Sequence, residues 1–242
     1  MRLRFRFRTV PFVATLVLVL LGIALGNWQT RRAAEKTALQ ARLEQGMAAA
    51  PLALDGSPVD PARLEFHRVV VTGEFVPNWP LFLDNRPQEG RSGFVLLMPF
   101  KIAGSNRFVL VARGWLPRNT AEHDRLPPYT TPAGRVTIEG RAVRQLARVM
   151  QLGTPAALQP NAIVQNTGPA EVARASGLDL LPVVVEQTGP DLPGDVLVRR
   201  GPAPSLDIDR HKGYAVQWYA LAAMAFLFFV ITGFRSGTKK AG

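Results

Sequence analysis

Two long uncharged apolar runs, one toward each end of the chain, constrain its fold more than any other feature. The first, Val10–Gly26, reads VPFVATLVLVLLGIALG, and the second, Tyr214–Phe234, reads YAVQWYALAAMAFLFFVITGF. As helices the runs would cover about 26 Å and about 31 Å, and Asn27 and Trp28 can extend the first toward the roughly 30 Å of a bilayer's hydrocarbon core. Aromatic residues gather at the entry to the second run, as is typical of a membrane–water interface: Tyr214, Trp218 and Tyr219. The sequence therefore predicts two transmembrane helices.

The basic charge of the chain is concentrated beside these runs. The formal net charge is +11, and it falls to +4 when the basic residues of the two ends are left out. Those residues are Arg2, Arg4, Arg6, Arg8, Arg235, Lys239 and Lys240. The positive-inside rule then places both ends in the cytoplasm and the block between the runs outside. A membrane topology thus accounts for the basicity without a nucleic-acid partner.

A cleaved signal peptide is the alternative interpretation of the first run. Ala24-Leu25-Gly26 has small residues at the spacing of a cleavage site, and the preceding N-terminus is basic. Against cleavage, the apolar run is longer than the usual core of about 7–15 residues, and the Trp28-Gln29 pair is poorly suited to processing. We therefore favour a retained span.

The block between the runs has the pattern of an α+β domain. Residues 30–48 are rich in helix-favouring side chains and predict a helix that continues from the first span. After Pro51, short β-like runs alternate with turn residues, and Pro169–Gly177 predicts one short helix. The candidate strands are Arg68–Gly73, Pro80–Asp84, Gly93–Ile102, Arg107–Arg113, Arg135–Arg144, Ala162–Gln165, Pro182–Gln187 and Asp195–Arg199. We expect a mainly antiparallel sheet or partly closed barrel with flanking helices.

These elements predict five parts along the chain. Residues 1–9 form a basic cytoplasmic N-terminus, 10–28 and 211–234 are transmembrane helices, 29–210 form an extracytoplasmic domain, and 235–242 form a basic cytoplasmic tail. The predicted fold class is α+β, with two transmembrane helices flanking a mainly antiparallel β extracytoplasmic domain.

The sequence lacks recognisable catalytic chemistry. The absence of cysteine excludes disulfides, Cys-ligated zinc, iron–sulfur clusters and a thiol nucleophile. There is no G-x-S-x-G, H-E-x-x-H, P-loop or G-x-G-x-x-G motif. Of the three histidines, His67 and His123 are predicted to be structural or solvated. We expect a protein that is not an enzyme, because the remaining class, an exported hydrolase, needs a nucleophile–base pair that the sequence does not show.

His211 has the most informative position, at the outer mouth of the second run. On a helix, the face of His211 also carries one large aromatic residue, several small residues and a deeper phenylalanine, and Tyr214 lies at its margin. The residues on this face are Ala215, Trp218, Ala222, Ala225 and Phe229. Such a stripe leaves room for a flat ligand or for a neighbouring helix, and the G-x-x-x-G of Gly22–Gly26 permits close helix approach. An imidazole above an apolar slot is a candidate axial ligand for haem iron, although the residues alone favour an interfacial anchor. Asp207 and Asp209 are better explained as helix caps than as metal ligands.

Three segments resemble the signature segments of the Surfeit locus protein 1 family. They are LGNWQTRR (25–32), VLVARGWLPR (109–118) and HKGYAVQWYALA (211–222), and their order, spacing and two-span topology match over almost the entire chain. The resemblance implies an assembly factor for haem–copper cytochrome c oxidase that binds haem a and assists its insertion into subunit I. It further implies a multi-pass protein of the cell inner membrane with cytoplasmic termini and a periplasmic central domain. The implied partners are oxidase subunit I, haem a synthase and the lipid bilayer, with no nucleic acid.

The resemblance also implies the residues of a haem site. By motif position, His211 is the iron ligand and Trp218 is the family tryptophan. Tyr214, at the margin of the same helix face, is the third predicted haem a-binding residue. Lys212 stands where the family commonly has an apolar residue, so a cation lies near the predicted haem mouth. This cation could pair with a haem propionate, or it could mean that the ligand lies deeper.

Two alternatives remain at this point. Arg113-Gly114-Trp115 is interpreted as the end of a strand at a glycine turn, with Trp115 capping the sheet, and the alternative is a contact with the partner subunit. The alternative function for the whole chain is a membrane-tethered interaction module that stabilises an oxidase assembly intermediate without binding haem.

Overall fold

The computed structural model describes residues 5–119, 121–122, 125–151, 153, 157–188, 196–199 and 207–238, without the side chains of 235–238. The chain divides into two compact units. One is helical and combines Met1–Ala41 with Ser205–Gly242, and the other, Arg42–Pro204, carries the sheet. The basic residues Arg2, Arg4, Lys239 and Lys240 lie outside the described residues.

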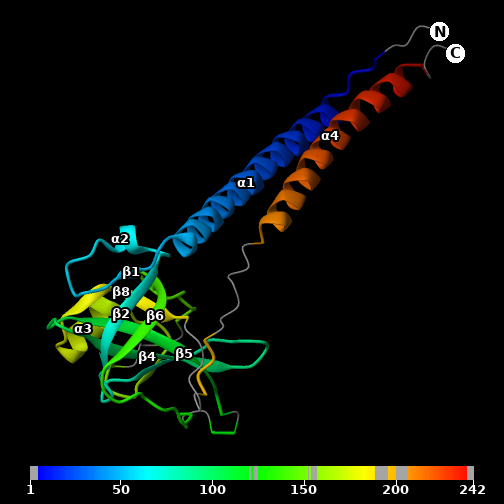
Figure 1. Cartoon of the computed structure of the whole chain (residues 1–242). Helices are drawn as coiled ribbons and strands as arrows, with labels where there is room; N and C mark the ends of the chain where they lie inside the picture. The colour runs from blue at the N-terminus through cyan, green and yellow to red at the C-terminus, as the bar shows by residue number, and fades with distance from the viewer. Residues whose placement is uncertain are drawn as a thin grey trace. The chain divides into compact units, whose positions relative to one another are not determined.

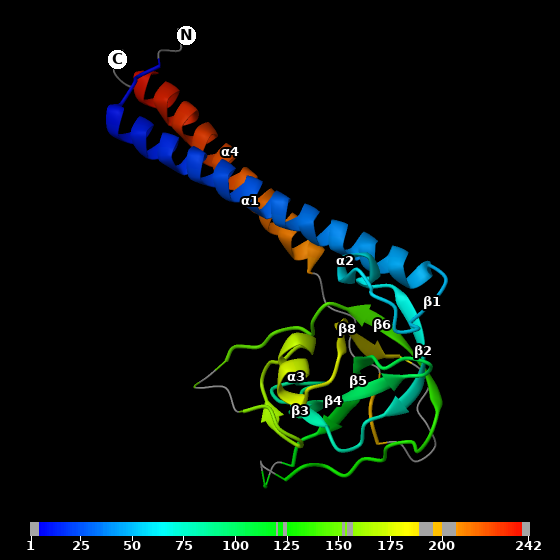
Figure 2. The same ribbon diagram turned by 90° about the vertical axis from the view of Figure 1, so that its left-hand side faces the viewer.

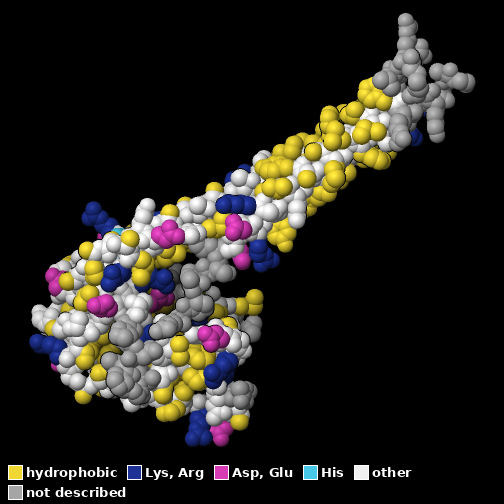
Figure 3. Space-filling model, turned by 45° about the vertical axis from the view of Figure 1, so that its right-hand side comes forward, with side chains coloured by type: hydrophobic (Ala, Val, Ile, Leu, Met, Phe, Trp, Pro, Cys, Tyr) yellow, Lys and Arg dark blue, Asp and Glu magenta, His cyan; other side chains and the backbone are white. Residues whose placement is uncertain are grey.

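The helical unit is built from two antiparallel helices, α1 (Thr9–Ala48) and α4 (Ile208–Thr238), which lie side by side in Figures 1 and 2. The start of α1 lies beside the end of α4, because the backbone amide of Arg6 donates to the carbonyl of Gly233 at 3.0 Å. Each helix is long and apolar enough to cross a membrane. As Figure 3 shows, hydrophobic side chains cover much of the visible surface of this pair, which is typical of helices that face lipid.

Helix α1 joins two segments that the sequence predicts separately. The apolar run and residues 30–48 form one uninterrupted helix, as expected. Pro11 lies in the first turn, where a backbone N–H would have no acceptor within the helix, so the absence of this N–H in proline costs no hydrogen bond. The last turns of α1 belong to the β unit, since the division between the units falls after Ala41.

Five strands of the β unit close into a barrel (Figure 1). They are β2 (Arg68–Phe75), β4 (Gly93–Ile102), β5 (Phe108–Pro117), β6 (Val136–Val143) and β8 (Leu180–Gln187). Neighbours pair in the order β2-β4-β5-β8-β6 and back to β2, and every step is antiparallel except β5–β8. Numbered along the chain, this is the 1-2-3-5-4-1 connectivity of an OB-fold Greek-key barrel.

Short elements complete the β unit. Strand β1 (Leu52–Ala53) pairs parallel to β2, β3 (Leu81–Leu83) pairs antiparallel to β4, and β7 (Ile163–Val164) pairs parallel to β3. The helices α2 (Pro61–Leu64) and α3 (Pro169–Ser176) lie in the connections. In α3 the side chain of Glu171 accepts from the Gly168 amide, and Gly177 ends the helix in the left-handed conformation.

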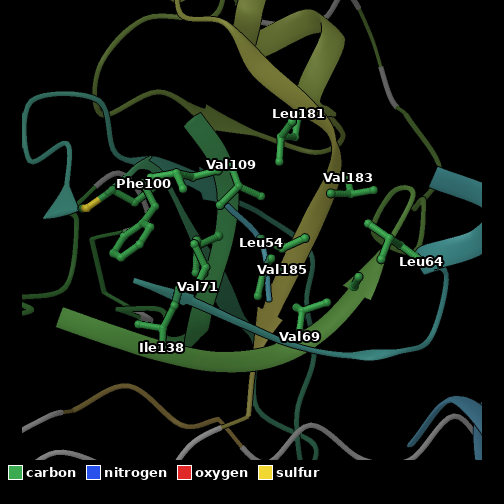
Figure 4. Packing of buried hydrophobic residues seen from close by; sticks show 14 of the residues in the cluster. Leu54, Leu64, Val69, Val71, Phe100, Val109, Ile138, Leu181, Val183 and Val185 are labelled. Carbon is green, nitrogen blue, oxygen red and sulfur yellow. The ribbon is translucent and has the colours of Figure 1, made fainter. Parts of the chain in front are cut away.

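The barrel interior is filled by the alternate residues of its strands. Strand β2 shows the pattern directly, with Val69 and Val71 almost fully buried and the residues between them partly exposed. Figure 4 shows this interior cluster, where β-branched side chains from different strands meet: Val69, Val71, Val109, Ile138, Val183 and Val185. A second cluster packs outside the barrel, where Val172 of α3 covers Leu110 and Val184.

The predicted fold class is confirmed: the chain is α+β, with two long apolar helices flanking a mainly antiparallel β domain. All but one of the eight predicted strands coincide with an observed strand to within a few residues, and the predicted short helix is α3. The predicted strand Asp195–Arg199 was wrong for its described residues, because Val198 makes only an isolated bridge to Trp115. Asp195 lies outside the described residues. Strand β1 and helix α2 were not predicted.

Candidate functional site

The two helices of the helical unit meet along a narrow stripe of mostly small side chains. The buried positions on this stripe are Gly22, Gly26, Gln29 and Ala33 of α1 and Ala215 and Ala222 of α4. Between the buried alanines of α4 and beyond them, the half-buried positions include His211, Trp218, Ala225 and Phe229. This is the stripe that helical periodicity predicts from His211. The sequence left room on this stripe for a flat ligand or for a neighbouring helix, and the structure places helix α1 against it.

The G-x-x-x-G segment allows the helices to approach closely. A methyl group built on Gly22 would lie 2.8 Å from Cβ of Ala222 and 3.0 Å from the carbonyl oxygen of Trp218. One built on Gly26 would lie 2.5 Å from the ring of Tyr219. Backbone and small side chains therefore fill the space between the helices at this level, and a planar ligand has no room there.

Side-chain hydrogen bonds link the two helices next to this close approach. Nδ1 of His211 lies 2.7 Å from Oε1 of Gln29, and the Tyr219 hydroxyl donates to Oδ1 of Asn27 at 2.8 Å. The same hydroxyl lies 3.4 Å from Oγ1 of Thr30, which donates to the carbonyl of Gly26. These contacts place His211 in a polar layer shared by both helices.

The surroundings of His211 set what its imidazole can do. His211 lies in the first turn of α4, and its backbone amide donates to the carbonyl of Asp207 at 3.3 Å. Nζ of Lys212 lies 4.0 Å from Oδ1 of Asp209, an acidic residue in the first turn, where it complements the helix dipole. Within the part of the chain that the structure describes, no group of three or more His, Asp or Glu side chains is placed to hold a metal ion.

The predicted haem-binding residues differ in their placement. His211 and Trp218 are half-buried on the face toward α1, whereas Tyr214 is 43% exposed on the margin of that face. The donor chemistry fits a haem, because Nε2 of His211 has no hydrogen-bond partner among the described residues and is the nitrogen that axial imidazoles commonly offer. Since the glycine stripe is closed, a haem held by His211 would have to lie outside the interface between the helices, where Tyr214 is exposed.

The mid-chain segment lies in the β unit and has a different structure from the one expected. The interpretation of Gly114 as the turn that ends a strand was wrong, because β5 continues through it to Pro117. Opposite β4, Leu96 pairs with Gly114 and Leu97 with Ala112, so Arg113 is the extra residue of a β-bulge. Gly114 permits the bulge with φ of 149°, a conformation that favours glycine.

Arg113 points into the protein interior, on the same face of β5 as Val109 and Val111, and is 1% exposed. Its Nη1 donates to Oγ1 of Thr131 at 2.9 Å and its Nη2 to the carbonyl of Thr130 at 2.8 Å. The guanidinium also lies 4.5 Å from the ring centre of Phe75. Burial raises the pKa of the neighbouring Tyr129, and the Arg113 charge opposes that rise. Arg113 therefore ties the 129–131 segment to the barrel.

Trp115 also has a structural role. Its ring is buried, its Nε1 donates to the carbonyl of Arg86 at 2.6 Å, and its backbone pairs with Val198. Trp115 and Gly114 form part of the wall of a cavity of about 430 Å³, whose other lining residues include Arg86, Arg141 and Glu186. The structure thus agrees with the expectation that Trp115 packs on the sheet.

His67 is not part of the helical unit's polar layer. His67 precedes β2 and is half-buried, with Nδ1 3.3 Å from the carbonyl of Glu65. His123 lies outside the described residues.

Comparison with known proteins decides the family. The sequence profile described as "SURF1 family" matches residues 16–223, which is most of the chain. The chain belongs to the SURF1 family. It is 29% identical to a SURF1-like protein of Monosiga brevicollis over 89% of this chain and 84% of that protein, and 27% identical to one of Rickettsia conorii (strain ATCC VR-613 / Malish 7) over 86% and 85%. It is also 35% identical to the cytochrome oxidase assembly protein SHY1 of Saccharomyces cerevisiae (strain ATCC 204508 / S288c), over 38% of this chain and 24% of that protein.

The SURF1 family match contains the close approach of Gly22 to Ala222 and the interhelical side-chain hydrogen bonds of Gln29 and Asn27. Two of the three signature segments meet in the structure, since residues 25–32 supply Gln29 and Asn27 and residues 211–222 supply His211 and Tyr219. The third segment, 109–118, contributes to β5 of the β unit.

The sequence analysis missed the interhelical hydrogen bonds that Gln29 makes with His211 and that Asn27 makes with Tyr219. A usable signal was present, because Asn27 and Gln29 are polar residues at the end of an apolar run, within a segment already matched to the family. Polar side chains at that depth commonly hydrogen-bond to another helix.

Proposed function

We propose that this chain is a membrane-anchored, non-catalytic assembly factor for haem–copper cytochrome c oxidase, and that it binds haem a through His211 and assists its insertion into subunit I. Membership of the SURF1 family and the similarity to a cytochrome oxidase assembly protein support the role in oxidase assembly. The two apolar helices support anchoring in the membrane where an integral oxidase is assembled.

The hydrogen bond between His211 and Gln29 is the single observation that carries the haem proposal. It occupies one imidazole nitrogen at 2.7 Å and leaves the other for a ligand. Iron of haem a supplies the Lewis acid that such a nitrogen binds. The exposed Tyr214 offers an aromatic surface beside it, and Lys212 offers a cation for a haem propionate.

The alternative function is a membrane-tethered interaction module that stabilises an assembly intermediate without haem. The observation in its favour is the closed packing of Gly22 against Ala222, because it gives the stripe below His211 a purely structural use. In that case His211 is a helix-linking residue and its loss affects assembly only through the stability of the helix pair.

We further propose that the chain lies in the cell inner membrane, with the β unit on the periplasmic side and haem a synthase among its partners. The support is the basic character of both termini and the requirement that newly made haem a reach subunit I within the membrane.

The test is complementation of a strain that lacks the chain. His211→Ala is compared with wild type and with His67→Ala, at equal membrane abundance, and the readouts are the a-type haem absorbance of the membranes and the oxidase activity. We expect His211→Ala to lower both several-fold and His67→Ala to restore both, since the imidazole of His67 lies 3.3 Å from the carbonyl of Glu65 in its own loop. Full restoration by His211→Ala favours the interaction module, and failure of wild type to restore the oxidase refutes the assembly role.

A further inference from the structure

The contact between His211 and Gln29 couples the tautomer of the imidazole to the orientation of the Gln29 amide. In the structure the Gln29 atom in the contact is the side-chain carbonyl oxygen, which accepts a hydrogen bond. In this orientation Nδ1 of His211 carries the hydrogen and donates it over 2.7 Å, whereas a flipped amide would donate to Nδ1 and leave the hydrogen on Nε2. In a neutral imidazole the second nitrogen, Nε2, is left with the lone pair.

The same contact also orients the ring. The two nitrogens lie on different sides of the five-membered ring, so an imidazole with Nδ1 against Gln29 has Nε2 directed away from that side chain. Gln29 is itself 9% exposed and is held on the buried stripe of α1 between Gly26 and Ala33. A buried acceptor on a regular helix is a fixed reference point, whereas a solvated histidine rotates freely about two side-chain bonds.

We propose that Gln29 is the positioning residue of His211: it selects the Nδ1–H tautomer and presents Nε2 as the nitrogen that binds haem iron. The proposal deepens the proposed function and rests on it for the identity of the bound group. Histidines that bind metals commonly donate their other ring N–H to a carbonyl or carboxylate, which fixes the ring and raises the basicity of the ligating nitrogen.

The charged groups near His211 do not compete with Gln29 for Nδ1 in the structure. Asp209 lies 4.0 Å from Lys212, and Asp207 lies 3.8 Å from Arg210, so each of these carboxylates faces a neighbouring cation. Asp207 reaches the histidine only through its backbone carbonyl, which accepts from the backbone amide of His211.

The first experiment measures the tautomer without haem. Protein labelled with ¹⁵N-histidine is purified in detergent from cells that make no haem a and examined by NMR at about pH 8, where an ordinary imidazole is neutral. The chain has three histidines, so the His211 signals are identified by their loss in His211→Ala. We expect the Nδ1–H tautomer in wild type and its loss in Gln29→Leu, whereas Gln29→Glu keeps an acceptor and keeps the tautomer.

The second experiment adds haem a to the same variants. We expect Gln29→Leu to weaken haem binding by about 10- to 100-fold, the usual effect of removing such an outer partner. Gln29→Glu should retain binding and lower the reduction potential of the iron, because a carboxylate makes the imidazole a stronger donor. Asn27→Leu is the matched control: it removes the other interhelical hydrogen bond, to Tyr219, and should leave the tautomer, the affinity and the potential unchanged.

The outcomes separate this proposal from the proposed function. An Nε2–H tautomer in wild type, or an unchanged tautomer in Gln29→Leu, overturns the role of Gln29. Equal loss of haem in Gln29→Leu and Asn27→Leu also overturns it, since both then act through helix packing. If wild type shows the Nδ1–H tautomer but binds no haem a, the haem part of the proposed function fails while the orientation of His211 by Gln29 stands.

Discussion

The hydroxyl of Tyr219 on α4 donates to the side-chain oxygen of Asn27 on α1 at 2.8 Å, while the ring of the same residue covers Gly26. One side chain thus contributes both a polar and an apolar contact to the helix pair. In a membrane the two contacts differ in weight, because interhelical hydrogen bonds add about 0.6 kcal/mol on average and close packing of small residues provides much of the remaining attraction.

Tyr219→Phe should therefore weaken the helix pair only slightly. The variant keeps the ring over Gly26 and loses the hydrogen bond, which predicts a cost of about 0.6 kcal/mol, or roughly a threefold shift in the closed fraction. Helix contact can be followed by cross-linking with a short bis-maleimide reagent between cysteines placed at Phe12 and Phe229, whose ring centres lie 5.8 Å apart. The chain has no native cysteine to interfere. If Tyr219→Phe lost as much cross-linking as a variant with isoleucine at Gly22 and Gly26, the hydrogen bond, and not the packing, would hold the helices together.

Replacing Gly22 and Gly26 by isoleucine should separate the helices. Each added side chain meets atoms of α4 within 2.8 Å, and the overlap costs about 1–3 kcal/mol at each position. The same cysteine pair should then cross-link several-fold less. Gly213→Ile is the matched control, because a methyl group built on Gly213 meets nothing within 4 Å. Unchanged cross-linking in the double variant would show that the G-x-x-x-G segment is incidental.

Arg113→Ala should destabilise the β unit by about 3 kcal/mol. The substitution leaves the Thr130 carbonyl and the Thr131 hydroxyl without their donor and opens a cavity beside Phe75. Urea unfolding of the full chain in detergent, followed by tryptophan fluorescence, measures the change. Arg107→Ala is the comparison: Arg107 pairs with the exposed Asp179, so its loss should cost less than about 1 kcal/mol. Equal effects of the two substitutions would refute the structural role of the buried guanidinium.

Both termini should lie in the cytoplasm, with residues 29–210 outside. Reporter proteins that are active on only one side of the membrane can be fused after Gly242 and into the β unit. Basic flanks resist translocation, so the fusion at Gly242 should be active only with a cytoplasmic reporter. Activity there of a reporter that works only outside would invert the topology. Intact mass should retain Met1–Gly26, and its absence would support the signal-peptide interpretation.

Local sequence patterns predicted most of the elements, because their causes are local. Apolar runs long enough for a bilayer predicted the two helices, and the run of β-branched residues from Val69 to Thr72 predicted β2. Closure of the barrel could not be predicted in this way. It depends on pairings between distant strands, such as β5 with β8, and on a close contact in which Gly73 lies against the Lys101 carbonyl because it has no side chain.

The site was predicted in part for the same reason. The face of α4 that carries His211 follows from the helical period, and the structure places that face against α1. The partner of His211 is Gln29, 182 positions away, and only the register of two antiparallel helices brings them together. The buried Arg113 was missed because a charged side chain is not expected in a core, although strand alternation places it on the same face as Val109 and Val111.

The visible absorption spectrum of the purified full-length protein, expressed in cells that make haem a, tests the central claim most directly. If Nε2 of His211 binds haem iron, wild type should carry a Soret band of a-type haem, and His211→Ala should lose or shift it at unchanged expression and membrane insertion. His67→Ala should leave the spectrum unchanged, as should His123→Ala, and Trp218→Leu should have an intermediate effect because it removes an aromatic surface and no ligand. Wild-type protein that purifies without haem and does not take up added haem a, or a His211→Ala spectrum identical to that of wild type, would contradict the account.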